Sequence, residues 1–124
     1  MPTVAITGAA GAIGAVTAQV FADAGWTLGL IDYDAEAITA LREAHPDAYV
    51  AQADLTNIDA ARGAFDGMAE QHAAPDAVLA IAGGFAMQAA TEATDADYAR
   101  MMDINMRTLF NTARAALPHL QTHA

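Results

Sequence analysis

The sequence of 124 residues contains no cysteine, no lysine and no serine. Without cysteine there are no disulfides and no thiolate metal sites, which fits a reducing compartment, and we expect a cytoplasmic protein. Without serine and lysine the polypeptide has no serine nucleophile, no Schiff-base lysine and no P-loop lysine. We expect neither a membrane span nor a signal peptide, because no apolar run reaches membrane length and a strand pattern begins at Thr3.

Positive charge is scarce, since five arginines face fifteen acids and the formal net charge is −10. Nucleic acids and anionic membranes are bound through basic surfaces, so we expect neither as a partner. Hydrophobic residues form 55% of the chain and charged residues only 16%, which is typical of a packed globular protein and not of a disordered segment. The length predicts one domain that spans residues 1–124.

Short apolar runs alternate with segments of helical periodicity along the chain. The apolar runs predict strands at residues 4–6, 28–31, 48–52 and 77–82. The periodic segments predict helices at residues 12–24, 35–44, 56–72 and 98–117, the last in a helical region opened by Thr94 and Asp95. Thr56 is the predicted cap of the third helix, and Pro118 is expected to break the last one. Strands joined by helices form right-handed crossovers, so the pattern predicts an α/β fold whose parallel sheet has the order 3-2-1-4 and helices on both faces.

The turn after the first strand carries the strongest chemical signal. It reads Thr-Gly-Ala-Ala-Gly-Ala-Ile-Gly over residues 7–14. Gly8 permits a tight turn, Gly11 leaves room for a pyrophosphate against the backbone, and Gly14 allows the helix to pack closely on the sheet. The free N–H groups at the start of the helix attract phosphate. The turn therefore predicts nucleotide binding, and simple tight packing in an alanine-rich chain is the alternative.

Acidic residues follow the second and third strands. Asp32 ends the second strand, where a carboxylate can accept both ribose hydroxyls of an adenosine and would repel a 2′-phosphate. No arginine lies near that strand end in the sequence, so NAD is favoured over NADP. Asp34 is a competing candidate, and a plain strand-end turn is another alternative. Asp54 and Leu55 could hold the adenine, or Asp54 could belong only to a helix-capping turn.

These motifs, followed by Ala82-Gly83 and by Asn105 within residues 103–106, resemble the short-chain dehydrogenase/reductase family. The chain matches only the N-terminal, nucleotide-binding half of that family. The resemblance implies a Rossmann-type fold and an NAD(H)-dependent oxidoreductase acting on alcohol or carbonyl groups. It implies these cofactor contacts: Gly8, Gly11, Ile13 and Gly14 with the pyrophosphate, Asp32 with the adenosine ribose, Asp54 and Leu55 with the adenine, and Ala82 and Gly83 with the nicotinamide-side ribose. It also implies that Asn105 is the catalytic asparagine that supports a proton-relay water.

The chain departs from the family pattern in three places. Ala12 stands where the standard branch has glycine, and Ala80-Ile81 replaces two asparagines, which predicts a looser site. The family's tyrosine is followed four residues later by a lysine that lowers its pKa, and a serine polarises the substrate carbonyl. Here Tyr98 is followed four residues later by Met102, and the chain has no lysine or serine. We therefore expect no turnover from this chain alone, and a non-catalytic NAD-binding or structural module is the alternative.

The last predicted helix carries an apolar stripe, formed by Met102, Met106, Leu109, Phe110, Ala113 and Leu117. The stripe is either ordinary core or a subunit contact. An uncovered edge on the fourth strand and an apolar helix face both favour a homodimer or a larger assembly, through that helix or through the strand edge. No metal site is expected, because His119 and His123 are four residues apart but have no third ligand in register.

Overall fold

The four apolar runs form one parallel sheet in the order β3-β2-β1-β4, in a computed structural model whose described residues are 1–120. The strands are β1 (Thr3–Thr7), β2 (Thr27–Asp32), β3 (Tyr49–Gln52) and β4 (Ala77–Ala80). The helices are α1 (Ala12–Asp23), α2 (Ala35–Ala44), α3 (Ile58–Gln71), α4 (Asp95–Met102), the π-helix η1 (Asp103–Arg107) and α5 (Thr108–Leu120). The predicted α/β fold and strand order are confirmed.

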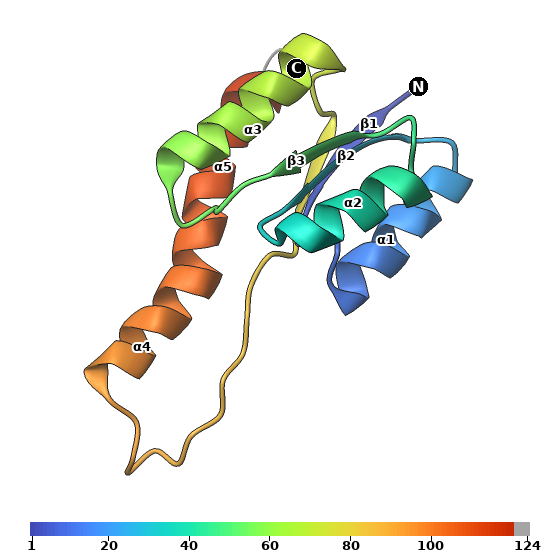
Figure 1. Cartoon of the computed structure of the whole chain (residues 1–124). Coiled ribbons are helices and arrows are strands. Elements are labelled where there is room, and N and C mark those ends of the chain that lie inside the picture. The colour runs from blue at the N-terminus through green and yellow to red at the C-terminus, as the bar shows by residue number, and fades with distance from the viewer. Residues whose placement is uncertain (121–124) are drawn as a thin grey trace.

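The sheet has a separate hydrophobic cluster on each face. Residues of β1 alternate between the two faces, so Ile6 belongs to the cluster under α1 and α2, and Ala5 to the cluster under α3 and α5. All five residues of β1 are buried, as expected for the central strand of a sheet covered on both sides (Figure 1). Met68 of α3 fills the space above Gly29, where a Cβ would lie 2.5 Å from the methionine sulfur.

Two predicted boundaries differ from the structure because side chains form hydrogen bonds with the backbone. Asn57, and not Thr56, caps α3, since its Oδ1 accepts the N–H groups of Asp59 and Ala60 at 2.9 and 3.2 Å. Thr56 instead donates its hydroxyl to Asp54. Strand β4 ends at residue 80 and not at 82, because the N–H groups of residues 81 and 82 both bind the hydroxyl of Thr7 at 3.2 Å.

The predicted last helix is longer and less regular than its periodicity indicates. It begins at Asp95, where Thr94 and Asp97 form a reciprocal capping box, and it passes through η1. The prediction that Pro118 breaks the helix is wrong, since α5 continues to Leu120. Proline removes only one helical hydrogen bond, and this one is in the last turn, where few bonds remain to be lost.

The connection from residue 81 to residue 94 contains no helix or strand, and α4 after it buries no residue. Figure 1 shows α4 at the far end of this long connection, extended away from the sheet. Among residues 1–120, no helix is both long enough and apolar enough to cross a bilayer.

The apolar stripe lies on the solvent side of this helical region. Its large side chains are between 40% and 59% exposed, whereas the buried face of α5 consists of Thr108, Asn111, Thr112, Ala115 and Ala116. The alternative that the stripe is ordinary core is therefore wrong.

Candidate functional site

A cleft of about 830 Å³ opens at the carboxyl ends of the four strands. Its lining consists of Gly8 and residues 10–14, residues 32–34 with Ala37, residues 53–56, residues 81–85, and Arg100, Ile104 and Thr108. Strands β2 and β3 are added on one side of β1, and β4 is added on the other side. Open parallel sheets bind ligands at the carboxyl ends of their strands where the strand order reverses in this way. All nine residues predicted to contact a cofactor line this one cleft. A smaller hollow of about 360 Å³, beside the start of β3, contains none of them.

Two glycines of the first turn are required by the packing of the protein itself. Gly8 has a φ of +64°, and a Cβ there would lie 2.8 Å from the backbone of Ala82. A Cβ at Gly14 would overlap the carbonyl oxygen of Gly8 and would lie 2.9 Å from the Cα of Ala9. These contacts explain how the turn places the start of α1 against the end of the sheet.

Gly11 differs from these two glycines. A Cβ there would meet only the carbonyl oxygen of Gly8, at an ordinary contact distance of 3.4 Å. Gly11 is the N-cap of α1, and no side chain caps this helix, so its first N–H groups are open to the cleft. The packing of the protein therefore does not require glycine at position 11, but a ligand that approaches the backbone there would. The open N–H groups are suited to binding an anion.

Asp32 joins the first turn to the end of β2. The residue is only 9% exposed, and its two carboxylate oxygens accept the N–H groups of Ala10 at 2.9 Å and Asp34 at 3.1 Å. Each oxygen retains a further lone pair for a ligand in the cleft. The competing candidate Asp34 caps α2, where its Oδ1 accepts the N–H group of Glu36 at 3.0 Å. Of the two acids, Asp32 therefore has the geometry of a fixed, inward acceptor.

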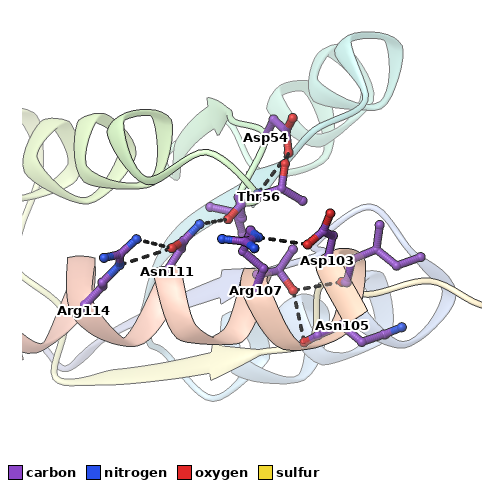
Figure 2. A network of polar contacts seen from close by, with 10 residues as sticks. Asp54, Thr56, Asp103, Asn105, Arg107, Asn111 and Arg114 are labelled. Carbon is purple, nitrogen blue, oxygen red and sulfur yellow. Dashed lines mark hydrogen bonds and ion pairs between the residues drawn. The ribbon is translucent and has the colours of Figure 1, made fainter. Parts of the chain in front are cut away.

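The turn after β3 is held from two sides. Asp54 is exposed, and its Oδ1 accepts both the N–H group and the hydroxyl of Thr56, so the helix-capping alternative describes part of its role. Leu55 is 4% exposed, and its carbonyl accepts the side-chain amide of Asn111 at 2.8 Å. Figure 2 shows Asn111 and Arg114 meeting on α5, where the guanidinium donates to the amide oxygen of Asn111.

Sequence reasoning missed two residues that shape the cleft. Asn111 is 1% exposed and links α5 to the turn after β3. Thr7 is fully buried and links the ends of β1 and β4 through its hydroxyl. The sequence places Asn111 with Thr108 and Thr112 on the face of α5 opposite the apolar stripe, but nothing in it identifies the carbonyl of Leu55 as the partner of Asn111.

Asn105 lies in η1 and holds the segment that follows β4. Its Oδ1 accepts the N–H group of Gly84 at 3.2 Å, and its Nδ2 donates to the carbonyls of Gly84 at 3.0 Å and Met101 at 2.9 Å. A Cβ at Gly83 would lie 2.6 Å from the same Oδ1, so this contact depends on glycine. The side chain is outside the lining of the cleft, and its catalytic role remains a prediction.

The tyrosines are distributed around the molecule and do not form a cluster. Tyr33 alone lines the cleft, whereas Tyr98 is exposed on α4. Tyr49 donates its hydroxyl to the carbonyl of Ala64 at 2.9 Å, and burial raises the pKa of this phenol above its usual value of 10.0. Among residues 1–120 no three histidine or acidic side chains are close enough to hold a metal. His119 contacts Asp66 at 2.7 Å, and His123 lies outside the described residues.

Comparisons with known proteins agree with this geometry. Residues 2–124 match the family model for short chain dehydrogenases. Sulfoacetaldehyde reductase 2 of Chromohalobacter salexigens is 33% identical over 94% of this chain and 48% of its own length. A short-chain dehydrogenase/reductase of Brucella melitensis is 30% identical, with a TM-score of 0.89 over 95% of this chain and 52% of its own. The NADH-dependent reductase A1-R', solved with NAD, is 30% identical, with a TM-score of 0.84 over 99% of this chain and 53% of its own.

The chain thus spans about half the length of the relatives it matches. The match extends over nearly all of this chain and includes the glycine turn, both strand-end acids and the Asn105 segment. The chain belongs to the short-chain dehydrogenase/reductase family.

Proposed function

We propose that this chain binds NAD(H) and is the nucleotide-binding half of an oxidoreductase that acts on alcohol or carbonyl groups. One observation carries the proposal: the open N–H groups of α1 and the inward carboxylate of Asp32 line the same cleft. The cleft volume of about 830 Å³ falls within the range of small-molecule sites. The reductase solved with NAD, at 30% identity, supports the choice of cofactor.

The residues present fit the chemistry of a dinucleotide. The open N–H groups beside Gly11 would hold the pyrophosphate, and Gly8, Ile13 and Gly14 would form the turn around it. Asp32 would accept the adenosine ribose hydroxyls. The remaining contacts proposed from the sequence are the adenine with Asp54 and Leu55, and the nicotinamide-side ribose with Ala82 and Gly83.

The charges around Asp32 favour NAD over NADP. Its neighbours in the lining of the cleft are Tyr33, Asp34, Ala37 and Asp54, which include two further acids and no cation. A 2′-phosphate beside Asp32 would therefore meet negative charge without a compensating arginine.

A bound nicotinamide supplies or accepts the hydride. Reduction of a carbonyl leaves an alkoxide that needs a proton, and the chain has neither a lysine nor a serine to assist a tyrosine there. We therefore expect this chain to bind and orient the cofactor without appreciable turnover by itself.

Fluorescence titration with NADH tests this function, and Gly11→Ala is the informative variant. The new methyl group has room against the protein but would occupy the space proposed for the pyrophosphate. Gly63→Ala on α3 is the matched control, because a Cβ there meets nothing within 4 Å. We expect NADH to bind the wild type and the control, and to bind Gly11→Ala much more weakly. Absence of NADH binding to the folded wild type would refute the proposal.

The exposed apolar stripe supports a second proposal, that two copies of the chain associate through α5. Between Thr108 and Leu117 this helix carries no acid, so an α5–α5 contact does not bring together the acids of a chain with a net charge of −10. Leu109 and Phe110 are 48% and 59% exposed and would gain burial in such a contact. The uncovered edge of β4 is the alternative contact.

Light scattering after size-exclusion chromatography distinguishes these arrangements. We expect a dimer that dissociates in Phe110→Glu but not in the control Thr39→Glu on the exposed face of α2. A clean 12.8 kDa particle for the wild type contradicts assembly. If the dimer persists in Phe110→Glu but dissociates after substitution of Ala80, the subunit contact is at the β4 edge instead.

The single domain and the cytoplasmic location remain part of the proposal. The cooperativity of unfolding tests the first, and cell fractionation tests the second.

A further inference from the structure

The charges that line the cleft are unevenly distributed. Three acids, Asp32, Asp34 and Asp54, follow β2 and β3 on one side. Arg100 of α4 also lines the cleft, and it is the only cation among the lining residues. The α1 terminus offers only partial charge, so Arg100 is the only full positive charge that the lining presents to a ligand, in a chain of net charge −10.

Arg100 is also the one arginine of the last helical region that no hydrogen bond or ion pair fixes in the described part of the chain. Arg107 donates to Asp103 at 2.9 Å. Arg114 donates to Asn111 and stacks over Phe110, with its guanidinium carbon 4.5 Å from the ring centre. Asp97, three residues before Arg100, uses its carboxylate to accept the N–H group and the hydroxyl of Thr94. These bonds, and to a smaller degree the charge of Arg100, lower the pKa of Asp97, but no ion pair joins the two side chains in the described part of the chain.

The neighbours of Arg100 show which part of the cleft it serves. Ile104 lies one turn further along the helical region and also lines the cleft. A Cβ at Gly84 would lie 2.5 Å from the Cδ1 of Ile104, so this part of the helical region is packed against the segment after β4. Phe85 follows and is 79% exposed at the same end. Arg100 thus lines the cleft one helical turn before the residue that packs against Gly84, and Gly84 follows β4, on the opposite side of β1 from the strand that carries Asp32.

We propose that Arg100 binds an anionic group, such as a phosphate, carboxylate or sulfonate, of the molecule that occupies the Gly84–Phe85 end of the cleft. The proposal rests on the proposed function, since it takes this cleft as the ligand site. A guanidinium pairs with two oxygens of such a group at once, and a ligand that excludes water strengthens the pair. The anion has two possible sources: the pyrophosphate of the dinucleotide, or the acidic group of a second small molecule.

The test compares wild type, Arg100→Gln and Arg107→Gln by NMR titration of the Gly84 and Phe85 amides. Arg107→Gln is the matched control, because it removes a charge from the same helical region but is outside the lining of the cleft. The probes are NADH, inorganic pyrophosphate, pyruvate and the uncharged analogue acetone, and the last two are added with and without NADH. Loss of one charge-assisted contact at an exposed site predicts about three- to tenfold weaker binding, and this difference shrinks as salt is added.

The outcomes separate the sources. Weaker binding of NADH and pyrophosphate to Arg100→Gln alone assigns Arg100 to the diphosphate. If Arg100→Gln binds pyrophosphate as the wild type does but no longer responds to pyruvate, and if acetone produces no response in any variant, then Arg100 binds the acidic group of a second small molecule. Equal affinities of Arg100→Gln and the control for every probe overturn the proposal, as does absence of any anion binding to the wild type. If the wild type binds pyrophosphate or pyruvate but not NADH, the proposed function fails, while the comparison of variants still decides the role of Arg100.

Discussion

Replacing Asp32 with asparagine removes the charge that is proposed to select NAD while leaving most of the side chain in place. The carboxylate now accepts two backbone N–H groups, from Ala10 and Asp34. Asparagine can accept one of them through its oxygen but presents an NH₂ group to the other. An unsatisfied, partly buried N–H group costs about 1–3 kcal/mol, so Asp32→Asn should be destabilised but should still fold.

The effect on binding is larger and specific to one cofactor. Hydrogen bonds to a charged acceptor contribute about 1.5–3 kcal/mol, so weakening one ribose contact lowers NADH affinity about 10- to 100-fold. The affinity for NADPH should fall much less, or rise, because the 2′-phosphate no longer meets a negative charge at Asp32. We therefore expect the preference for NADH over NADPH to shrink by about tenfold or more in Asp32→Asn.

Fluorescence titrations of both cofactors on the same preparations measure this preference, with a thermal melt to confirm that each variant is folded. Asp34→Asn is the control, because asparagine caps a helix about as well as aspartate does and should leave α2 intact. Equal losses for NADH and NADPH in Asp32→Asn would remove Asp32 from the ribose contact. A change of preference in Asp34→Asn would transfer the role to the competing acid.

Three further predictions concern the packing and hydrogen bonds that stabilise the fold. Gly14→Ala should lower the unfolding free energy by about 2 kcal/mol or more in chemical denaturation, because its Cβ would overlap the Gly8 carbonyl, and unchanged stability would contradict this packing. Asn111→Ala should cost about 2–3 kcal/mol and increase hydrogen exchange in the turn after β3, whereas exposed Thr39→Ala should not. Burial raises the pKa of the Tyr49 phenol in the folded protein. The neutral phenol therefore contributes its full stabilisation below pH 10, and this stabilisation is lost as pH rises through the folded-state pKa. In denaturation experiments, Tyr49→Phe should reduce this dependence of the unfolding free energy on alkaline pH.

The fold could be predicted because it depends on local patterns. Apolar runs such as 28–31 and the periodicity of 35–44 are sufficient to locate strands and helices, and the handedness of crossovers restricts the order of the strands. The ends of elements were less predictable, since they depend on contacts between distant residues. Strand β4 stops where the hydroxyl of Thr7, more than seventy positions earlier, takes the next two N–H groups. No window of sequence around β4 contains that information.

The candidate site shows the same division. The turn of residues 7–14 and Asp32 were predictable as parts of one cleft, because their spacing follows from what a diphosphate and a ribose require of a strand, a turn and a helix, and their contacts with a cofactor stay predictions. Asn111 was not, since its bond to the carbonyl of Leu55 joins residues 56 positions apart. The contact that holds the segment after β4 was equally hidden, because the side chain of Asn105 binds the backbone of Gly84, 21 positions earlier.

The residues of this chain are suited to binding a cofactor but lack the groups that proton transfer to a substrate requires. Every segment that lines the cleft lies between Gly8 and Thr108, and the proposed dinucleotide contacts all fall within these segments. Proton transfer to a substrate needs an acid of matched pKa close to the reacting oxygen. The only tyrosine on the cleft, Tyr33, follows β2, on the same side as Asp32 and Asp34, and the chain has no lysine or serine to assist it. Cofactor binding with negligible turnover is thus the combination that these residues predict, and robust turnover by the purified chain would contradict it.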